Sequence, residues 1–319
     1  MTRTTTTTTR ALAASGAALA LALTAGCGSD DGASADGGSD GITVRTTEFS
    51  WVAATLTNEV VRQVAADHPD LGVADLETSQ LDPAAAWAGA GNGDLDLVTE
   101  VALPNQQPLL DQTEGFELLG EVYSGADQGW YVPTYALEPG QPLEGLTSVT
   151  QLPEYADALD STLYDADPGW ITTEQNEARL AGYDIGFEHS TSSAAALFAQ
   201  LDRAYEREEP VLVYLYQPHW VFAQYDVTKL EEPNPYEEGC FAEGGAGDCA
   251  MPDYAGGVAA SDELPEEVPA STEVLSRIEF PVDDMDAMTA EVDVEERDAA
   301  DVAQEWVEEN DDAVESWVG

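Results

Sequence analysis

The sequence predicts an α/β protein with two lobes. Short apolar segments with strand character alternate with amphipathic helical segments between residues 42 and 98, a pattern typical of a parallel sheet with helices on both faces. A second series of the same kind begins near Gly129. The chain of 319 residues is long enough for two lobes of roughly 100–200 residues each.

The elements of the first lobe follow in order from Ile42. Ile42 and Val44 alternate with polar residues and open a strand. Apolar residues at helical spacing from Leu56 to Val64 then predict an amphipathic helix over about 53–66. Further along the chain, a strand, a helix and a buried strand are expected over 73–76, 84–90 and 95–98.

The second lobe is predicted over residues 129–229, after a first part of lobe 1 over 42–128. Apolar runs and helical spacing define its elements in the same way. Strands are expected at 130–132, 163–164 and 211–216, and helices over 172–181 and 192–205.

Residues 230–319 are predicted to contain a loop-rich segment and then to return to lobe 1. The loop-rich part, at about 232–270, holds several prolines and glycines. A last helix over about 302–317 places Trp306 and Trp317 three turns apart on one face. We expect both rings to be core residues.

The N-terminus has the pattern of a lipoprotein signal peptide, over residues 1–26. Arg3 and Arg10 precede an apolar run that ends in small residues before Cys27, and the ending LTAGC resembles the bacterial lipobox. A lipid on Cys27 would hold the protein at the outer face of the membrane. The alternative is an ordinary secretory signal. Residues 27–41 are predicted to be a flexible tether, since only Gly, Ser, Ala and Asp follow the cysteine.

The two other cysteines, Cys240 and Cys249, are predicted to form a disulfide. An exported chain meets oxidising conditions, and the glycines between the two residues allow a tight loop. Such a bond would contribute roughly 2–3 kcal/mol by the loop-entropy estimate. Two free thiols are the alternative.

The charge balance is strongly acidic. There are 63 Asp and Glu residues against 10 Lys and Arg, a formal net charge of −53. Such a surface repels phosphate backbones, so we expect no nucleic-acid partner. With three histidines and three cysteines, we also expect no metal site and no cofactor. The acidity indicates either a solvated surface or, as we favour, adaptation to high salt.

No motif of catalysis is present, so the sequence does not predict an enzyme. The GAGNG segment at 89–93 lacks the Lys-Ser/Thr of a phosphate-binding loop. His68 lies in a polar stretch and His189 in a predicted turn. Carboxylates are so numerous that their pairing is uninformative. An exported hydrolase using His189 or His219 stays as a minor alternative.

Aromatic residues stand at the ends of predicted strands or the starts of helices. Trp51, Trp130, Trp170 and Trp220 all have this placement. Ligands of α/β lobes bind at the carboxyl ends of strands. Several π faces around one cavity suit a cation without N–H groups, such as a quaternary ammonium. Taken singly, a tryptophan in such a place is more often a core residue than a ligand residue.

Several segments also match a known family, and they stand in the family's order. They are GDLDL (93–97), LP (103–104), GWYVPTY (129–135), DPG (167–169), the serine-rich 190–193, ALFAQLDRAYEREEPVLV (196–213), YQPHWVFAQYDVTKLEEP (216–233) and AQEWVEEN…VESWV (303–318). The chain thereby resembles the substrate-binding proteins of bacterial ABC transporters for glycine betaine and related compatible solutes. The resemblance implies a periplasmic-binding-protein-like fold, with a ligand cleft between two lobes and no enzymatic activity.

The resemblance also implies site residues. The family holds the trimethylammonium head in a tryptophan box, and His219 and Trp220 belong to its PHW segment. Phe280 takes the place of a second box tryptophan. Ala102 stands where the third is expected, before Leu-Pro. Trp51, Phe49, Trp130 or Trp170 would then have to fill that wall.

The predicted function is capture of a small zwitterionic or cationic solute outside the cell for delivery to an ABC permease. Closure of the lobes over the ligand by a hinge is expected. The loss of a tryptophan at Ala102 leaves another ligand open, such as choline, carnitine, ectoine or an amino acid. A sensory or structural lipoprotein with the same fold is a further alternative.

Overall fold

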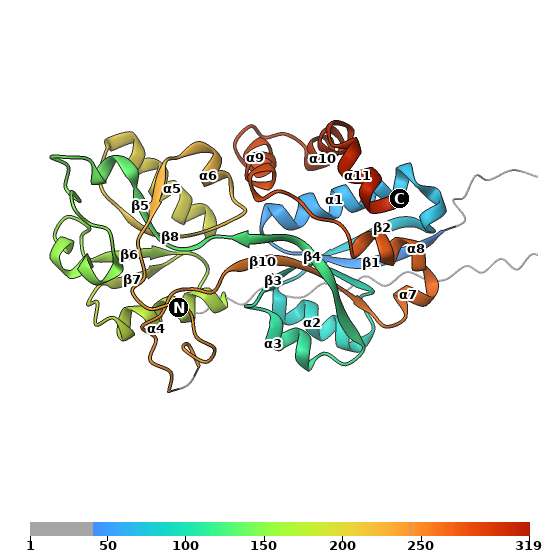
Figure 1. Cartoon of the computed structure of the whole chain (residues 1–319), viewed down its shortest axis with the longest axis horizontal. Coiled ribbons are helices and arrows are strands. Elements are labelled where there is room, and N and C mark those ends of the chain that lie inside the picture. Colours follow the sequence, from blue (N-terminus) through green and yellow to red (C-terminus); the bar gives the residue numbers. More distant parts are fainter. Residues whose placement is uncertain (1–40, 243) are drawn as a thin grey trace, which may run out of the picture. The chain divides into compact units, whose positions relative to one another are not determined.

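The structure, a computed structural model, describes residues 41–242 and 244–319. The predicted signal peptide, Cys27 and residues 28–40 of the predicted tether lie outside the described residues. The described part of the chain forms two five-stranded sheets, one in each lobe (Figure 1). None of the helices described is both long and apolar enough to cross a membrane.

The first lobe is organised around one sheet. Its strands are β1 (Ile42–Glu48), β2 (Val73–Gln80), β3 (Leu97–Leu103), β4 (Phe116–Ala126) and β10 (Tyr254–Ser261). Their order is β2-β1-β3-β10-β4. β1 is parallel to β2 and β3, whereas β10 is antiparallel to β3 and β4. The sheet is therefore mixed, and not parallel throughout as the alternation suggests, because β10 enters it from the second lobe.

The second lobe has a sheet of the same size and of mixed direction. Its strands are β5 (Gln128–Pro133), β6 (Thr162–Asp165), β7 (Glu188–Thr191), β8 (Leu212–Tyr216) and β9 (Val227–Lys229). Their order is β7-β6-β8-β5-β9. β6 is parallel to β7 and β8, and β5 is antiparallel to β8 and β9. His189 belongs to β7, so the predicted turn at this residue is a strand.

Two neighbouring strands connect the lobes. Only Asp127 separates β4 from β5, so one strand runs on from the first sheet into the second (Figure 1). The chain returns through β10, whose first residue Tyr254 pairs with Ala126 of β4. Adjacent crossing strands of this kind allow two lobes to move about a hinge.

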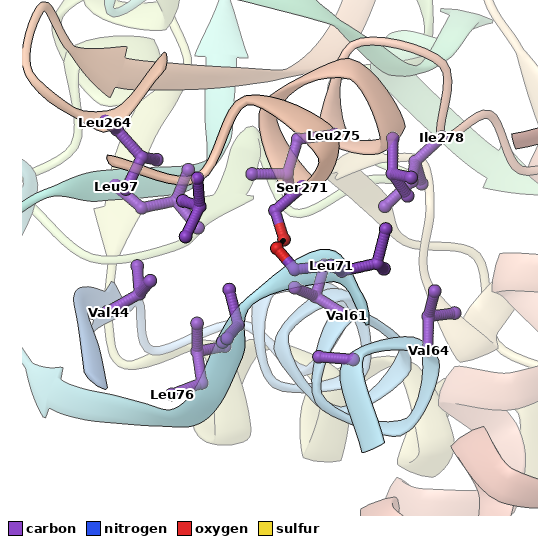
Figure 2. A pocket seen from close by; sticks show the side chains of 14 residues that line it. Val44, Val61, Val64, Leu71, Leu76, Leu97, Leu264, Ser271, Leu275 and Ile278 are labelled. Atoms are coloured by element: carbon purple, nitrogen blue, oxygen red, sulfur yellow. Dashed lines mark hydrogen bonds between the residues drawn. The ribbon is translucent and has the colours of Figure 1, made fainter. Parts of the chain in front are cut away.

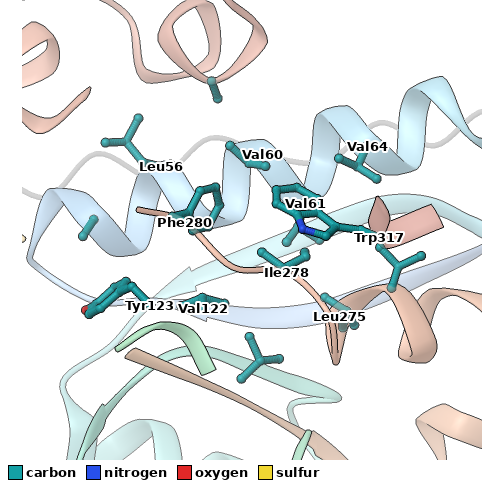
Figure 3. Packing of buried hydrophobic residues seen from close by; sticks show 14 of the residues in the cluster. Leu56, Val60, Val61, Val64, Val122, Tyr123, Leu275, Ile278, Phe280 and Trp317 are labelled. Carbon is teal, nitrogen blue, oxygen red and sulfur yellow. The ribbon is translucent and has the colours of Figure 1, made fainter. Parts of the chain in front are cut away.

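Helices cover the first sheet. They are α1 (Val52–Asp67), α2 (Pro83–Asn92), α3 (Gln107–Gln112), α7 (Leu264–Glu267), α8 (Pro269–Leu275), α9 (Val282–Asp293), α10 (Ala299–Glu309) and α11 (Asp311–Val318), with a 3-10 turn η1 (Pro69–Leu71). The apolar side of α1 carries the predicted core residues. In Figure 3, Leu56, Val60 and Val64 lie along α1 near Phe280 and Trp317. This packing ties the C-terminal helices to the first lobe.

The predicted last helix is interrupted. α10 ends at Glu309 and α11 begins at Asp311, because the amide group of Asn310 donates a hydrogen bond back to the Trp306 carbonyl and ends the first helix. The bend still leaves Trp306 and Trp317 stacked, with ring centroids 5.7 Å apart. Both rings are buried, as the sequence predicts.

The second lobe is covered by fewer helices. They are α4 (Ile171–Gly182), α5 (Ala194–Arg207) and α6 (Trp220–Gln224), with 3-10 turns η2 (Thr134–Leu137) and η3 (Val149–Tyr155). In α5 the side chain of Ser193 accepts a hydrogen bond from the Ala196 N–H and so caps the helix. Leu197 and Leu201 on its apolar side are buried, at the predicted positions.

The segment between β9 and β10 packs against the second lobe. Leu230 and Met251 at its two ends belong to that lobe's core. Glu232 forms an ion pair with the fully buried Arg179 of α4. Cys240 and Cys249 are joined by a disulfide. The segment thus has defined partners even though it contains few regular elements.

A small apolar cavity of about 20 Å³ lies in the core of the first lobe, between α1 and α8 (Figure 2). Valine and leucine side chains form most of its wall. The hydroxyl of Ser271 is directed to the Leu71 carbonyl, to which it donates a 2.9 Å hydrogen bond. With no free polar group, the cavity is a packing gap and offers nothing to a polar ligand.

Candidate functional site

A larger cavity, of about 780 Å³, is lined by residues of both lobes. Its wall is formed by Ser50, Trp51, Gln80, Leu81, Asp82, Pro83, Ala84, Ala102, Asn105, Gln106, Pro108, Leu109, Asp167, Gly169, Trp170, Ile171, Thr172, Tyr214, Tyr216 and Tyr254. Most of these residues lie at or just after the carboxyl ends of β1, β2, β3 and β6, and Tyr214 and Tyr216 belong to the last residues of β8. This is where α/β sheets place their ligands.

A series of aromatic rings runs along the cavity wall. Trp51 of the first lobe and Trp170 of the second meet edge to face, with centroids 6.2 Å apart. Trp170 in turn meets Tyr216 at 5.5 Å, and Tyr216 stacks near Tyr214 at 6.1 Å. Tyr254, on the crossing strand β10, completes the set. Five rings from three parts of the chain thus share one cavity.

Trp51 and Trp170 hold equivalent places in the two lobes. Trp51 is the N-cap residue of α1, and Trp170 is the N-cap residue of α4. An indole cannot accept a hydrogen bond from a backbone N–H, and neither helix has a side-chain cap. Both helices therefore begin beside the cavity with uncapped N–H groups and the positive ends of their dipoles.

Two polar side chains of this wall, Asn105 and Thr172, have a buried oxygen without a hydrogen-bond partner among the described residues. Asn105 is 7% exposed, and its Oδ1 has no hydrogen-bond partner among the described residues. The neighbouring Gln106 is occupied, because its Oε1 accepts a 3.0 Å hydrogen bond from the Trp87 indole. Asn105 therefore offers a ligand an unused amide oxygen in this wall, and the exposed amide of Gln80 lies in the same wall.

Behind the aromatic wall lies a buried carboxyl group, that of Glu100 in β3. Its side chain is completely buried, and Oε2 accepts a 2.7 Å hydrogen bond from the Tyr123 hydroxyl. Burial raises the pKa of Glu100 to about 7, although the Tyr123 hydroxyl and the nearby Trp51 indole N–H lower it in part. Oε1 of Glu100 and Nε1 of Trp51 are both buried without a hydrogen bond.

Of the residues that the sequence assigns to the site, Trp51 and Trp170 line the cavity. Ala102 also lines it, so the position where the family has tryptophan does face this space. Phe49 stacks on Trp51 from behind, with centroids 4.5 Å apart, and supports that ring.

Trp130, Trp220, His219 and Phe280 are not among the lining residues. Trp130 is fully buried in the second lobe, where its indole donates to Asn176. The Arg179 guanidinium lies 4.1 Å above the Trp130 ring. Core packing and these polar contacts account for the position of Trp130.

His219 and Trp220 turn away from the cavity after β8. The His219 ring stacks on Phe198 at 3.9 Å, and Trp220 packs against Phe198 at 5.5 Å. Burial lowers the pKa of His219 to about 3, so it is neutral. Phe280 lies in the core of the first lobe, 5.0 Å from the Trp306 ring. Packing in the cores of the lobes draws these rings away from the cavity.

Sequence reasoning missed three tyrosines and two polar residues of the region: Tyr214, Tyr216, Tyr254, Asn105 and Glu100. A signal existed for Glu100, which is the one charged residue in the apolar run of β3. Tyr214 and Tyr216 are two residues apart and so share one face of β8. Tyr254 follows the loop-rich segment and has no local signal.

Two α/β lobes, joined by paired crossing strands and sharing an aromatic cavity, define a two-lobed solute-binding protein. Over residues 42–309 the chain matches the family described as the substrate-binding domain of ABC-type glycine betaine transport systems, and it belongs to that family. The family expected from the sequence segments is thereby confirmed.

Curated relatives match part of the chain. The glycine betaine/carnitine transport binding protein of Listeria monocytogenes is 28% identical over 155 residues, 48% of this chain and 47% of that protein. The trimethylamine N-oxide-binding protein of Pelagibacter ubique is 30% identical over 119 residues, 37% of each chain. The chain thus spans less than half the length of these relatives in the matched regions.

Solved structures show the same fold over most of the chain. Lactococcal OpuAC, closed on glycine betaine, has a TM-score of 0.71 at 22% identity and covers 87% of this chain and 99% of its own. An ABC-transporter choline-binding protein with choline has a TM-score of 0.68 at 19% identity, covering 86% and 91%. The predicted two-lobed α/β fold is confirmed.

Proposed function

We propose that this protein is the extracytoplasmic substrate-binding component of an ABC importer and that it binds a quaternary-ammonium solute of the glycine betaine class. The observation that carries the proposal is the ring series Trp51, Trp170 and Tyr216 in one cavity, together with Tyr214 and Tyr254. A cation over an indole face gains roughly 0.5–2 kcal/mol, and more when water is excluded.

The carboxylate end of a zwitterionic ligand can also be bound by hydrogen-bond donors beside the cavity. The uncapped N-termini of α1 and α4 begin at Trp51 and Trp170 and present backbone N–H groups to an anion. An amide such as that of Asn105 donates to a carboxylate through Nδ2. A carboxylate at the helix ends and a trimethylammonium group against the rings would fit one small zwitterion.

A second ligand, choline, is favoured by a specific observation. Ala102 leaves one part of the wall without a large ring, and Asp82 and Asp167 bring carboxylates to the same wall. Choline carries a net positive charge and no carboxylate, so an acidic wall attracts it, whereas the same wall repels the carboxylate of glycine betaine. The choline-binding structure of the same fold is consistent with such a ligand in this architecture.

A titration of the purified mature chain tests the proposal. Glycine betaine, choline, carnitine and ectoine are added separately, and the melting temperature and the calorimetric binding heat are measured. A ligand at a hundredfold excess over its Kd stabilises the fold by about 2.7 kcal/mol. We expect glycine betaine or choline to do so. Stabilisation by ectoine or an amino acid alone would contradict the quaternary-ammonium assignment.

The attachment to the membrane is proposed from the sequence. A lipid on Cys27 and removal of residues 1–26 would hold the protein beside a permease at the outer face of the membrane. Intact-mass analysis of membrane-extracted protein tests this directly. An unmodified Cys27, or cleavage at another bond, would exclude the lipid anchor.

We also propose that the protein has no catalytic activity. The proposal is supported by family membership, because its members bind solutes. His219 is stacked on Phe198 and is buried and uncharged at neutral pH, which leaves it poorly placed as an acid or base. Incubation with choline esters and analysis of the products would reveal a hydrolase.

A further inference from the structure

Glu100 combines two unfavourable features that a purely structural residue would avoid. Its carboxyl group is fully buried, and among the described residues it forms no ion pair. Its backbone is in the left-handed region, at φ 59°, where residues with a side chain are rarely found. Costs of this kind tend to be concentrated at functional sites.

The left-handed residue interrupts the regular alternation of side chains along β3, so that Thr99 and Val101 face opposite sides of the sheet. Thr99 faces α1, where its hydroxyl donates to Asn58, and Val101 faces the opposite side of the sheet. The pairing with β10 is irregular at this place, between Gly257 and Ala259. Glu100 is thus an inserted residue in the strand, and its carboxyl reaches the Tyr123 hydroxyl.

The carboxyl of Glu100 lies one side chain behind the cavity. The Trp51 indole N–H lowers the pKa of Glu100, and the ring of Trp51 lines the cavity. The Tyr123 ring, which holds Oε2, stacks near Tyr254 at 6.2 Å, and Tyr254 lines the cavity as well. Glu100 is therefore linked to the aromatic wall through the Tyr123 ring, which lies beside Tyr254.

Among the described residues, the titratable groups that face Glu100 are tyrosine hydroxyls. They come from β4, β10 and β8, as Tyr123, Tyr254 and Tyr216. Burial raises the pKa of each, and the charge of Glu100 raises them further. These hydroxyls stay neutral. A negative charge at Glu100 consequently has no positive partner within the part of the chain that the structure describes.

We infer that Glu100 is a specificity-determining residue whose negative charge, acting through the aromatic wall, selects solutes with a permanent cationic head group. The inference rests on the proposed function. A bound quaternary ammonium would supply the missing positive charge in a region of low dielectric, where an unscreened pair interacts strongly. Neutral solutes gain nothing from this charge, and anionic solutes are repelled.

Binding of a cation beside Glu100 should depend on pH. Glu100 is largely protonated below neutral pH, and a bound cation favours its ionised form. Binding near pH 7 should therefore release a proton, and affinity for a cation should rise between about pH 6 and pH 8. Replacement by glutamine keeps the shape and the acceptor for Tyr123 but removes the charge.

Calorimetric titration of the full mature chain with choline and with glycine betaine, at pH 5.5 and pH 8, tests the role of Glu100. We expect Glu100→Gln to weaken choline binding about tenfold at pH 8 and to change it little at pH 5.5, where the wild-type residue is protonated. The affinity for glycine betaine should fall less than that for choline, since Glu100 also repels the carboxylate of glycine betaine. Glu121→Gln, at an exposed position of β4, is the matched control and should bind like the wild type.

The proton is measured separately in the wild type, so that the test does not depend on the variant. Titrations at pH 7 in phosphate and in Tris should differ in apparent heat if a proton is released. Equal affinities of wild type and Glu100→Gln at pH 8, or no buffer dependence, would overturn the role of Glu100 while leaving the proposed function intact. Failure of the wild type to bind either solute would overturn both.

Discussion

The pKa of Glu100 predicts that this residue destabilises the ligand-free protein at alkaline pH. The folded-state pKa of about 7 exceeds the ordinary value of 4.5. The unfolded chain therefore loses this proton at lower pH than the folded chain does. The favourable contribution of the protonated group is complete below about pH 4.5 and is lost as the pH rises through 7.

The magnitude follows from the same two values. A difference of 7 minus 4.5, at 1.36 kcal/mol per pKa unit, corresponds to about 3 kcal/mol at pH 8. Glu100→Gln removes the titration and leaves a neutral hydrogen-bond acceptor for Tyr123. We therefore expect the variant to be more stable than the wild type by up to about 3 kcal/mol at pH 8, and by much less at pH 5.

Urea unfolding of both proteins, without ligand and at constant salt, measures this difference. Curves at pH 5 and pH 8 give the free energy of unfolding of each. Glu121→Gln serves again as the control for the loss of one surface charge. An equal difference between wild type and Glu100→Gln at both pH values would show that Glu100 does not titrate in this range, and the argument would fail.

Three other results are expected. Trp170→Ala should weaken a quaternary-ammonium ligand about tenfold, since its ring lines the cavity, whereas Trp220→Ala should lower stability and leave calorimetric affinity nearly unchanged. The melting temperature should rise steeply from low to molar salt, because ions screen the repulsion within a chain of net charge −53. A melting temperature that does not change with salt would mean that the carboxylates do not repel one another appreciably. Thiol labelling of the native protein should find neither Cys240 nor Cys249 reactive, and labelling of both would exclude their disulfide.

The alternation of strands and helices was predictable because each element has a local pattern. In α1 and α5, the spacing of the apolar residues predicts which side chains of each helix are buried. β4 and β10 were not predicted, since their long glycine-containing segments have no clear period. The pairing of Tyr254 with Ala126 joins residues that are 128 positions apart, and only the assembled fold brings them together.

The site was predictable where a ring is held by its own local structure. Trp51 and Trp170 each precede a helix directly after a strand, and this local geometry places them at the cavity. The choice between Tyr216 and Trp220 depends on tertiary contacts instead. Phe198 on α5 packs against Trp220 and withdraws it from the cavity, and no local pattern contains that contact.

The lobes also touch through a pair of hydrogen bonds next to the cavity. Asp286 of α9, in the first lobe, accepts from the His219 N–H at 2.7 Å and from the Gln217 amide at 2.6 Å, both in the second lobe. Gln217 directly follows Tyr216, so a movement of the lobes that alters these bonds also shifts a ring of the site. Burial raises the pKa of Asp286 to about 6, and hydrogen bonds from both partners favour its ionised form.

If the proposed function is right, the two tryptophans at the helix starts would serve both ends of a zwitterionic ligand from the same positions. Because each indole replaces a polar N-cap, its helix keeps its first N–H groups free for an anion while the ring itself is offered to a cation. One of these units comes from each lobe, and their rings are in edge contact across the cavity. A zwitterion bound in the proposed way would need both units, and so both lobes, close together, which would couple its binding to closure.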